Sequence, residues 1–292
     1  MGIATLIAAG RLDDRLVHTA RSVLANAGVR VGDLSWIDAG DAADLTIDGE
    51  AATARVALDM IDGLDFAVLA GERVPAQLFV ADMDSTMIGQ ECIDELADYA
   101  GVKDAVAAIT ERAMQGELDF AAALAERVAL LKGLDHQIIA KCRQARIRPN
   151  PGAATLVATM KRHGALTALV SGGFTDFVRP VGKELGFQQL RANALGVEDG
   201  KLTGTTVGKI VDAQAKRHFA EQLLADLGVG FESLIAVGDG ANDAPLIAIA
   251  GLGVGYRPKP ALAAVAGGII RHHDLTAVLW MQGIPRRDWV VI

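Results

Sequence analysis

The sequence predicts an α/β protein: a doubly wound parallel sheet that carries a helical insert after its first strand and follows a smaller α+β unit. Residues 78–81 form a short apolar run typical of a buried parallel strand, and two aspartates follow it closely. More than 80 residues separate this run from the next strong one at 166–170, although a βαβ unit needs only about 30. Upstream of residue 71, strand and helix patterns alternate.

The N-terminal unit is predicted to contain elements in the order βαββαβ, which is the split ferredoxin-like layout. Its helices are expected near residues 14–27 and 51–61, and its strands near 5–9, 33–38, 44–48 and 66–70. The polar stretch 71–77 contains Pro75, and a new buried strand follows it. We therefore predict two domains, residues 1–74 and 75–292.

The long interval after the first strand of the second domain is predicted to be a helical cap over residues 88–149. Helix-period apolar positions indicate four helices, near residues 90–99, 102–114, 118–131 and 135–145. The cap closes at the turn sequence Pro149-Asn150-Pro151-Gly152.

The α/β alternation then resumes. Helices are expected up to residue 163 and over residues 175–185 and 210–227, and strands over 166–170, 234–237 and 253–256. The pair Asp199-Gly200 predicts a hairpin between residues 194–198 and 201–207. Ile269 and Ile270 are expected to begin a further edge strand.

Composition excludes several function classes. A formal charge of -8 and 4% aromatic residues oppose a nucleic-acid partner, because such partners need cationic surfaces and stacking platforms. The apolar stretches are shorter than the ~18 residues of a membrane span, and the first residues lack a basic leader segment. Cys92 and Cys142 match no disulfide framework or zinc spacing, so we expect two buried thiols. These features favour a cytoplasmic protein without a membrane partner.

Polar clusters follow or lead into the predicted parallel strands. Asp82 and Asp84 follow residues 78–81, and further polar clusters are formed by Ser171-Gly172-Gly173, Lys216 and Gly238-Asp239-Gly240-Ala241-Asn242-Asp243. Ligands of open α/β sheets bind at the carboxyl ends of the strands, so these residues are expected at one crevice. Four carboxylates at one crevice would repel one another unless a divalent cation binds there. Hard oxygen ligands point to Mg²⁺.

These motifs, in this order, resemble the four motifs of haloacid-dehalogenase-type phosphatases over about residues 76–275. The resemblance implies that Asp82 is the nucleophile that forms an aspartyl-phosphate and that Asp84 is the general acid and base. It implies a metal bound by Asp82, Asp239 and the main-chain carbonyl of Asp84, with Asp243 supporting the metal shell. The alternative for the first pair is a solvated turn after a strand.

The resemblance also implies which residues hold the phosphate: Ser171, Gly172, Lys216 and Asn242. Lys216 lies on an otherwise apolar stripe of its predicted helix, where a lysine most often extends its ammonium to water. The family match instead implies a cation that clamps the phosphate. Asn242 and Asp243 could equally cap the helix expected near Pro245, and the two roles are compatible.

Substrate choice is expected to depend on the cap. Arg127 is the charge on a stripe with Phe120, Leu124, Val128 and Leu131, and a guanidinium there suits a substrate carboxylate. The resemblance places Glu91 at a substrate ammonium and Phe120 over the substrate. Periodicity alone would place Glu91 on a solvent face, and Phe120 could be a core aromatic.

Within the family, the motifs are most similar to those of enzymes that hydrolyse O-phospho-L-serine to L-serine and phosphate, the last step of serine biosynthesis. Two alternatives remain: a phosphatase for another small ester such as phosphohomoserine, and a non-catalytic amino-acid sensor. The N-terminal unit resembles the ACT-type modules attached to some bacterial members. It could bind an effector or form a homodimer, and the sequence does not separate these roles.

Overall fold

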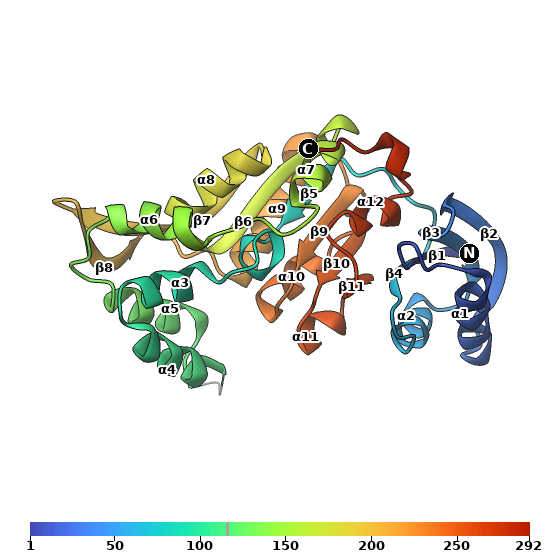
Figure 1. The fold of residues 1–292 in the computed structure, drawn as a ribbon, viewed down its shortest axis with the longest axis horizontal. Helices are drawn as coiled ribbons and strands as arrows, with labels where there is room; N and C mark the ends of the chain where they lie inside the picture. Colours follow the sequence, from blue (N-terminus) through green and yellow to red (C-terminus); the bar gives the residue numbers. More distant parts are fainter. Residues whose placement is uncertain (115–116) are drawn as a thin grey trace.

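The computed structural model describes residues 1–114 and 117–292, and their strands form one continuous sheet (Figure 1). Within these residues the sheet has eleven strands in the order β2-β3-β1-β4-β11-β10-β9-β5-β6-β7-β8. The strands are β1 Gly2–Ile7, β2 Arg30–Asp38, β3 Ala42–Asp48, β4 Asp65–Leu69, β5 Leu78–Ala81, β6 Leu166–Phe174, β7 Gln189–Glu198, β8 Lys201–Val207, β9 Leu234–Gly238, β10 Leu252–Tyr256 and β11 Gly268–Ile270.

The strands from β11 to β7 are parallel to one another, which confirms the predicted doubly wound fold. β5 is fully buried and pairs with β6 on one side and β9 on the other. The chain runs outward from β5 through β6 to β7 and later returns to β9, beside β5. The carboxyl end of β5 is therefore the point where the winding direction reverses, and such points are where open α/β sheets bind ligands.

Helices cover both faces of this sheet, and each face has its own hydrophobic core. One face carries α7 (Ala153–Arg162), α8 (Thr175–Leu185) and α12 (Ala277–Met281), and the other carries α9 (Ala213–Leu227) and α10 (Ala244–Ile247). The short helix α11 (Pro260–Ala263) follows β10. The sequence analysis missed α11 and α12, because helices of four or five residues are too short to show a helical period.

The helical cap is inserted between β5 and β6, as predicted. Its helices are α3 (Cys92–Tyr99), α4 (Lys103–Met114), α5 (Phe120–Ala129) and α6 (Gln137–Arg146). After α5 the chain runs beside the β7–β8 hairpin, where main-chain hydrogen bonds of 2.8 Å join Gly133 and Leu134 to Leu202. The hairpin turn has left-handed φ angles of 50° at Asp199 and 73° at Gly200, as an Asp-Gly turn predicts.

The N-terminal unit has the predicted element order, with α1 (Asp14–Asn26) and α2 (Ala51–Asp59) between its strands. Asp13 caps α1 by accepting a hydrogen bond from the Leu16 N–H at 2.8 Å. Strands β2, β3, β1 and β4 pair antiparallel in that order. The similarity to ACT-type modules and the domain boundary stay predictions.

One prediction about the sheet is wrong: the strand that contains Ile269 and Ile270 is not an edge. β11 pairs antiparallel with β4 of the N-terminal unit, with Ile269 opposite Phe66, so the sheet continues between the two units. Arg73 links the two units, because its guanidinium binds the Asp44 carboxylate of β3 at 2.8 and 2.9 Å and its Nε donates to the Met281 carbonyl of α12 at 2.9 Å. A three-residue strand gives no sequence signal of the strand beside it.

Candidate active site

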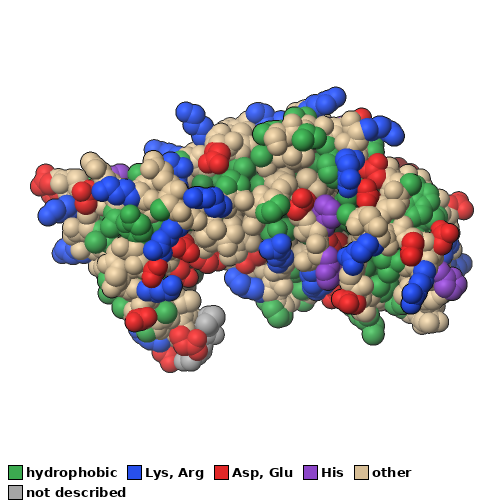
Figure 2. Space-filling model, in the orientation of Figure 1, with side chains coloured by type: hydrophobic (Ala, Val, Ile, Leu, Met, Phe, Trp, Pro, Cys, Tyr) green, Lys and Arg blue, Asp and Glu red, His purple; other side chains and the backbone are tan. Residues whose placement is uncertain are grey.

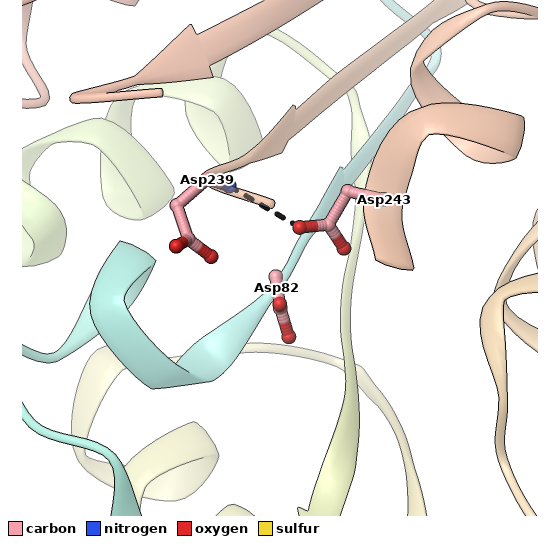
Figure 3. A group of neighbouring side chains, drawn as sticks. All are labelled: Asp82, Asp239 and Asp243. Atoms are coloured by element: carbon pink, nitrogen blue, oxygen red, sulfur yellow. Dashed lines mark hydrogen bonds between the residues drawn. The ribbon is translucent and has the colours of Figure 1, made fainter. Parts of the chain in front are cut away.

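Three buried carboxylates meet at the carboxyl ends of β5 and β9. Asp82 directly follows β5. Asp239 directly follows β9, and Asp243 ends the short helical turn Ala241–Asp243 that comes next. Their side chains point toward one another (Figure 3), and one ligand oxygen from each lies within 4.8 Å of the others. The N–H of Asp82 donates to the Val237 carbonyl at 2.9 Å, which ties the end of β5 to β9. Parallel pairing of the two strands thus brings these acids together.

Lys216 is the cation within this group. Its side chain comes from α9 and is 1% exposed, with Nζ 2.8 Å from both Asp82 Oδ2 and Asp243 Oδ1. Burial acts to lower the pKa of Lys216, but the two carboxylates outweigh it and raise that pKa above its ordinary value, so the ammonium stays charged. The side chain faces the carboxylates rather than extending to water.

The Asp82 carboxyl resists ionisation in this setting. Burial, followed by the charge of Asp243, raises the pKa of Asp82 well above its ordinary value, and Lys216 opposes that shift. Burial likewise raises the pKa of Asp239. Because one buried ammonium does not offset three buried carboxylates, a further cation would stabilise their charged forms.

The residues fit a divalent metal ion of the hard class. Their donors are carboxylate oxygens, which suit Mg²⁺, and these oxygens are close enough to share one ion. Both oxygens of Asp243 already accept hydrogen bonds: Oδ1 from Lys216 and Asn242, and Oδ2 from the N–H groups of Asp239 and Gly240. Asp82 also accepts hydrogen bonds on both oxygens, Oδ1 from the Met83 N–H and Oδ2 from Lys216 and Asn242, whereas the ion pair of Asp239 with Lys259 uses Oδ2. Asp239 is thus the acid with the most capacity for a metal, and a metal there would lie beside Asp82.

Asp84 lies apart from the three acids, on a turn formed by Met83–Met87. Its Oδ1 accepts the Cys92 N–H at 2.8 Å and its Oδ2 accepts the Ser171 hydroxyl at 2.9 Å. Ser85 follows with a left-handed φ of 54°, a strained conformation for serine that turns the chain sharply after the carboxylate. Asp84 is thus held at the crevice by the first turn of the cap and by the end of β6.

The Ser171-Gly172-Gly173 motif lies within β6 and not after it. Pairing of β6 with β7 is interrupted between Val170 and Phe174, so the motif forms a bulge in the strand. The Ser171 Oγ accepts the Gly173 N–H at 2.8 Å. A Cβ atom at residue 173 would lie 2.9 Å from Asp84 Oδ2, so the close approach of Asp84 requires glycine there.

Asn242 faces the Asp82 carboxylate. Its Nδ2 lies 3.2 Å from Asp82 Oδ2, and Asp243 makes no side-chain capping bond to α10. Asp243 instead caps the short helical turn Ala241–Asp243 by accepting the Gly240 N–H at 3.3 Å, so a capping role and a site role coexist at Asp243.

The cap places its predicted residues across a cleft from the core. Figure 2 shows the hollow between the cap and the end of the sheet near α10 and α11. Phe120 is 37% exposed, and its Cζ is so close to Gly172 that a Cβ there would lie 3.0 Å away. The aromatic ring therefore contacts the bulge and does not belong to the hydrophobic core.

Glu91 and Arg127 are charged residues of the cap that lie near enough to interact electrostatically. The carboxylate of Glu91 accepts the Ser85 hydroxyl at 2.8 Å. Enclosure of that carboxylate and, second, the charge of Asp84 raise the pKa of Glu91 to about 7. Arg127 is half-buried on α5, and its Nε donates to the Ala123 carbonyl. No carboxylate among the described residues lies within 4.0 Å of its guanidinium.

Sequence reasoning missed two residues. Asn193, buried in β7, donates to the Gly172 carbonyl at 2.7 Å and accepts the Val211 N–H at 2.7 Å, which joins the bulge to the approach to α9. Little in the sequence indicated this residue, because Asn193 lies one residue before the strand predicted over residues 194–198. Lys259 lies with Nζ 2.9 Å from Asp239 Oδ2. The sequence could have indicated Lys259, because it is a basic residue shortly after a parallel strand, at the edge of the sheet where ligands bind.

The structure also bears on the two cysteines and on the expected absence of a membrane span. Cys92 and Cys142 are buried free thiols, as expected. Among the helices of the described residues, we find none with the length and apolarity needed to cross a membrane.

Comparison with known proteins places this geometry among hydrolases. The family model described as haloacid dehalogenase-like hydrolase matches residues 79–248, more than half of the chain. A phosphoserine phosphatase of Polaromonas sp. is 45% identical over 208 residues, which cover 70% of this chain and 88% of that protein. A structure of a probable phosphoserine phosphatase from Vibrio cholerae aligns with a TM-score of 0.77 at 33% identity, over 98% of this chain and 88% of that one.

Longer relatives match as well. The phosphoserine phosphatase of Streptomyces coelicolor is 42% identical over 228 residues, which cover 77% of this chain and 55% of that protein. The chain spans between 52% and 60% of the length of the first three curated relatives it matches.

Proposed function

The chain belongs to the haloacid dehalogenase-like hydrolases, and on that premise we propose that it is a phosphatase that hydrolyses O-phospho-L-serine to L-serine and phosphate. The observation that carries the proposal is the buried group of Asp82, Lys216, Asp239 and Asp243, with Asp84 and Ser171 beside it. Similarity to phosphoserine phosphatases over most of this chain supports the substrate.

In the first half-reaction, an Asp82 carboxylate oxygen attacks phosphorus while the bond from phosphorus to the serine oxygen breaks. Lys216, the Ser171 hydroxyl and the Asn242 amide supply positive charge and hydrogen-bond donors to the phosphate oxygens. Asp84 donates a proton to the leaving serine oxygen. The hydrogen bond that Asp84 accepts from the Cys92 N–H fixes the direction of its carboxyl group, and the Ser171 hydroxyl, which donates to Asp84 in this structure, would turn its one proton to the phosphate.

In the second half-reaction, water attacks the phosphorus of the aspartyl-phosphate and the Asp82 carboxylate is released. Asp84, deprotonated by the first step, accepts the proton of that water. A Mg²⁺ ion held by Asp82, Asp239 and the main-chain carbonyl of Asp84 would neutralise charge on the phosphate. The cap excludes other nucleophiles while the acyl-phosphate exists.

Substrate recognition is assigned to two charges of the cleft. Within the described residues the Arg127 guanidinium has no ion-pair partner within 4.0 Å, although Asp94 and Glu91 act on it electrostatically, and its fork of N–H donors matches the two oxygens of the phosphoserine carboxylate. Glu91 suits the ammonium group, and Ser85 orients its carboxylate. Phe120 would cover the substrate between them.

The proposed function is tested by measuring phosphate release from a panel of phosphate esters, with Mg²⁺ and with excess chelator. We expect turnover of phosphoserine with Mg²⁺ and none after chelation. Equal rates on phosphohomoserine, or on esters without the ammonium or carboxylate, would contradict the substrate assignment. Binding of serine without hydrolysis of any ester would instead favour the amino-acid sensor.

Replacing Arg127 should raise KM. For Arg127→Ala we expect KM for phosphoserine to increase about 10- to 100-fold with a smaller change in kcat, since a charged hydrogen-bonded contact is lost. KM for a phosphate ester without a carboxylate should not change. Arg162→Ala removes an exposed arginine from α7 and is the matched control. An unchanged KM for phosphoserine would refute the role of Arg127.

The raised pKa of Glu91 predicts a pH dependence of KM. As pH falls through about 7, the Glu91 carboxyl becomes protonated and loses its attraction for the substrate ammonium, so KM should rise. Glu91→Gln should have a higher KM that lacks this titration, whereas Glu184→Gln should behave as the wild type. The substrate phosphate titrates near pH 6 in every variant. A profile in Glu91→Gln identical to that of the wild type would contradict the assignment.

We also propose a cytoplasmic homodimer that forms through the N-terminal unit. The free cysteines support a reducing compartment. An apolar groove of about 610 Å³ lies between α1 and α2, with Val56 69% and Met60 80% exposed. Light scattering should give the mass of a dimer for the wild type and for His18→Glu. The double variant Val56→Glu/Met60→Glu should be monomeric, and an unchanged mass would contradict this interface.

A further inference from the structure

Lys259 is a second cation at the acidic group, and the mechanism above does not use it. Its Nζ lies 2.9 Å from Asp239 Oδ2. The side chain of Asp239 is 8% exposed, whereas that of Lys259 is 64% exposed, so the ammonium approaches from the solvent side. The pair therefore covers the outward oxygen of a carboxylate that we assign to the metal.

The backbone keeps Lys259 at this position. Its N–H donates to the Asp239 carbonyl at 2.8 Å, so the two residues are joined through main chain as well as side chain. Lys259 precedes α11, where Pro260 occupies the first helical position and Lys259 is extended, with φ −67° and ψ 154°. The Cα of Lys259 thus stays beside Asp239 wherever its flexible side chain points.

The two lysines of the site differ in how easily their ammonium groups can leave the carboxylates that they contact. Lys216 is buried and bridges Asp82 and Asp243, so its removal would leave two buried carboxylates without their cation. Lys259 contacts a single carboxylate from an exposed position, and its ammonium can move into water at little cost. Asp239 can therefore exchange this cation for another.

We propose that Lys259 competes with the divalent cation for Asp239 and thereby lowers the metal affinity of the enzyme. An ammonium group on Asp239 Oδ2 neutralises part of the charge that attracts a metal ion and repels that ion at short range, so metal binding works against the ion pair and favours displacement of Nζ. The ion pair shields the acidic group before the metal binds and keeps the metal exchangeable. This inference rests on the metal assignment of the proposed function.

The test is the dissociation constant of Mg²⁺, measured by titration calorimetry on the full chain without substrate. Lys259→Met should bind Mg²⁺ roughly three- to tenfold more tightly than the wild type, because a partly exposed ion pair no longer opposes binding. Lys259→Arg keeps the charge and should bind within about twofold of the wild type. Lys183→Met removes an exposed lysine from the last turn of α8 and should leave the affinity unchanged.

An affinity of Lys259→Met equal to or weaker than that of the wild type would overturn the inference. So would tighter binding in Lys183→Met by the same factor, since that would indicate net charge and not the Asp239 contact. These outcomes leave the proposed function untouched. If the wild type and all variants bind no Mg²⁺, the metal assignment itself fails, which distinguishes the two failures.

Discussion

Asp82→Asn should reduce phosphate release from phosphoserine by about 10⁴-fold or more, the largest effect that we expect from any single substitution. The amide that replaces the carboxylate cannot form the acyl-phosphate, so the reaction loses its covalent route and not merely a contact. Stopped reactions with labelled substrate should show no phosphoprotein. Turnover near the wild-type rate would refute Asp82 as the nucleophile.

Asp84→Asn separates the nucleophile from the proton donor. This variant keeps Asp82, so both half-reactions should slow by about 10²- to 10⁴-fold while phosphoprotein can still form. Asp82→Asn should fold as the wild type does, because it removes a buried carboxyl whose pKa is already raised by burial and by Asp243. Equal melting temperatures of the two variants and of the wild type would show that the rates report chemistry.

Lys216→Met should abolish activity and also lower the free energy of unfolding by about 3–5 kcal/mol in the metal-free protein. The lysine is 1% exposed and lies 2.8 Å from two carboxylates, which would remain buried without their cation. The double variant Lys216→Met/Asp82→Asn should recover part of this loss, because one of the unpaired charges is gone. Urea unfolding measures all three values, with Lys183→Met as the control.

The loss in Lys216→Met should depend on pH with a definite sign. Burial already raises the pKa of Asp82 above its unfolded value of about 3.9, and loss of the opposing ammonium raises it further, so the folded state binds more protons than the unfolded state. Its stability then falls as pH rises. The deficit relative to the wild type should be larger at pH 8 than at pH 5. A deficit no larger than that of Lys183→Met at both pH values would contradict the role of the buried pair.

Local patterns were sufficient for most of the fold. Residues 78–81 and 175–185 form a strand and a helix with the predicted bounds, because a continuous apolar run and a helical period are each set by side chains close in sequence. The Asp-Gly turn and the cap helices could be predicted for the same reason. The role of β11 could not be predicted, since its neighbour β4 lies some 200 residues earlier in the chain.

The residues of the candidate site also fall into two groups, those that local patterns indicate and those that they do not. Asp82, Asp84, Ser171, Lys216 and Asp239 were found because each lies at or near a predicted strand end or on a predicted helix face. Glu91 was identified only through the family resemblance, because periodicity assigned it to a solvent face. Its contact with Ser85 depends on the left-handed turn after Asp84, which no apolar pattern indicates.

The sequence by itself determined the kind of protein: a doubly wound sheet, a helical cap after its first strand, and acids at the strand ends that suit phosphate chemistry with a divalent cation. Only the tertiary structure decided how these charges are shared. It placed Lys216 between Asp82 and Asp243 and paired Lys259 with Asp239. It also joined the N-terminal unit to the parallel sheet through β4 and β11. The physical reason is that periodicity reports which face of an element is buried, whereas ion pairs and strand neighbours depend on distances between segments remote in the chain.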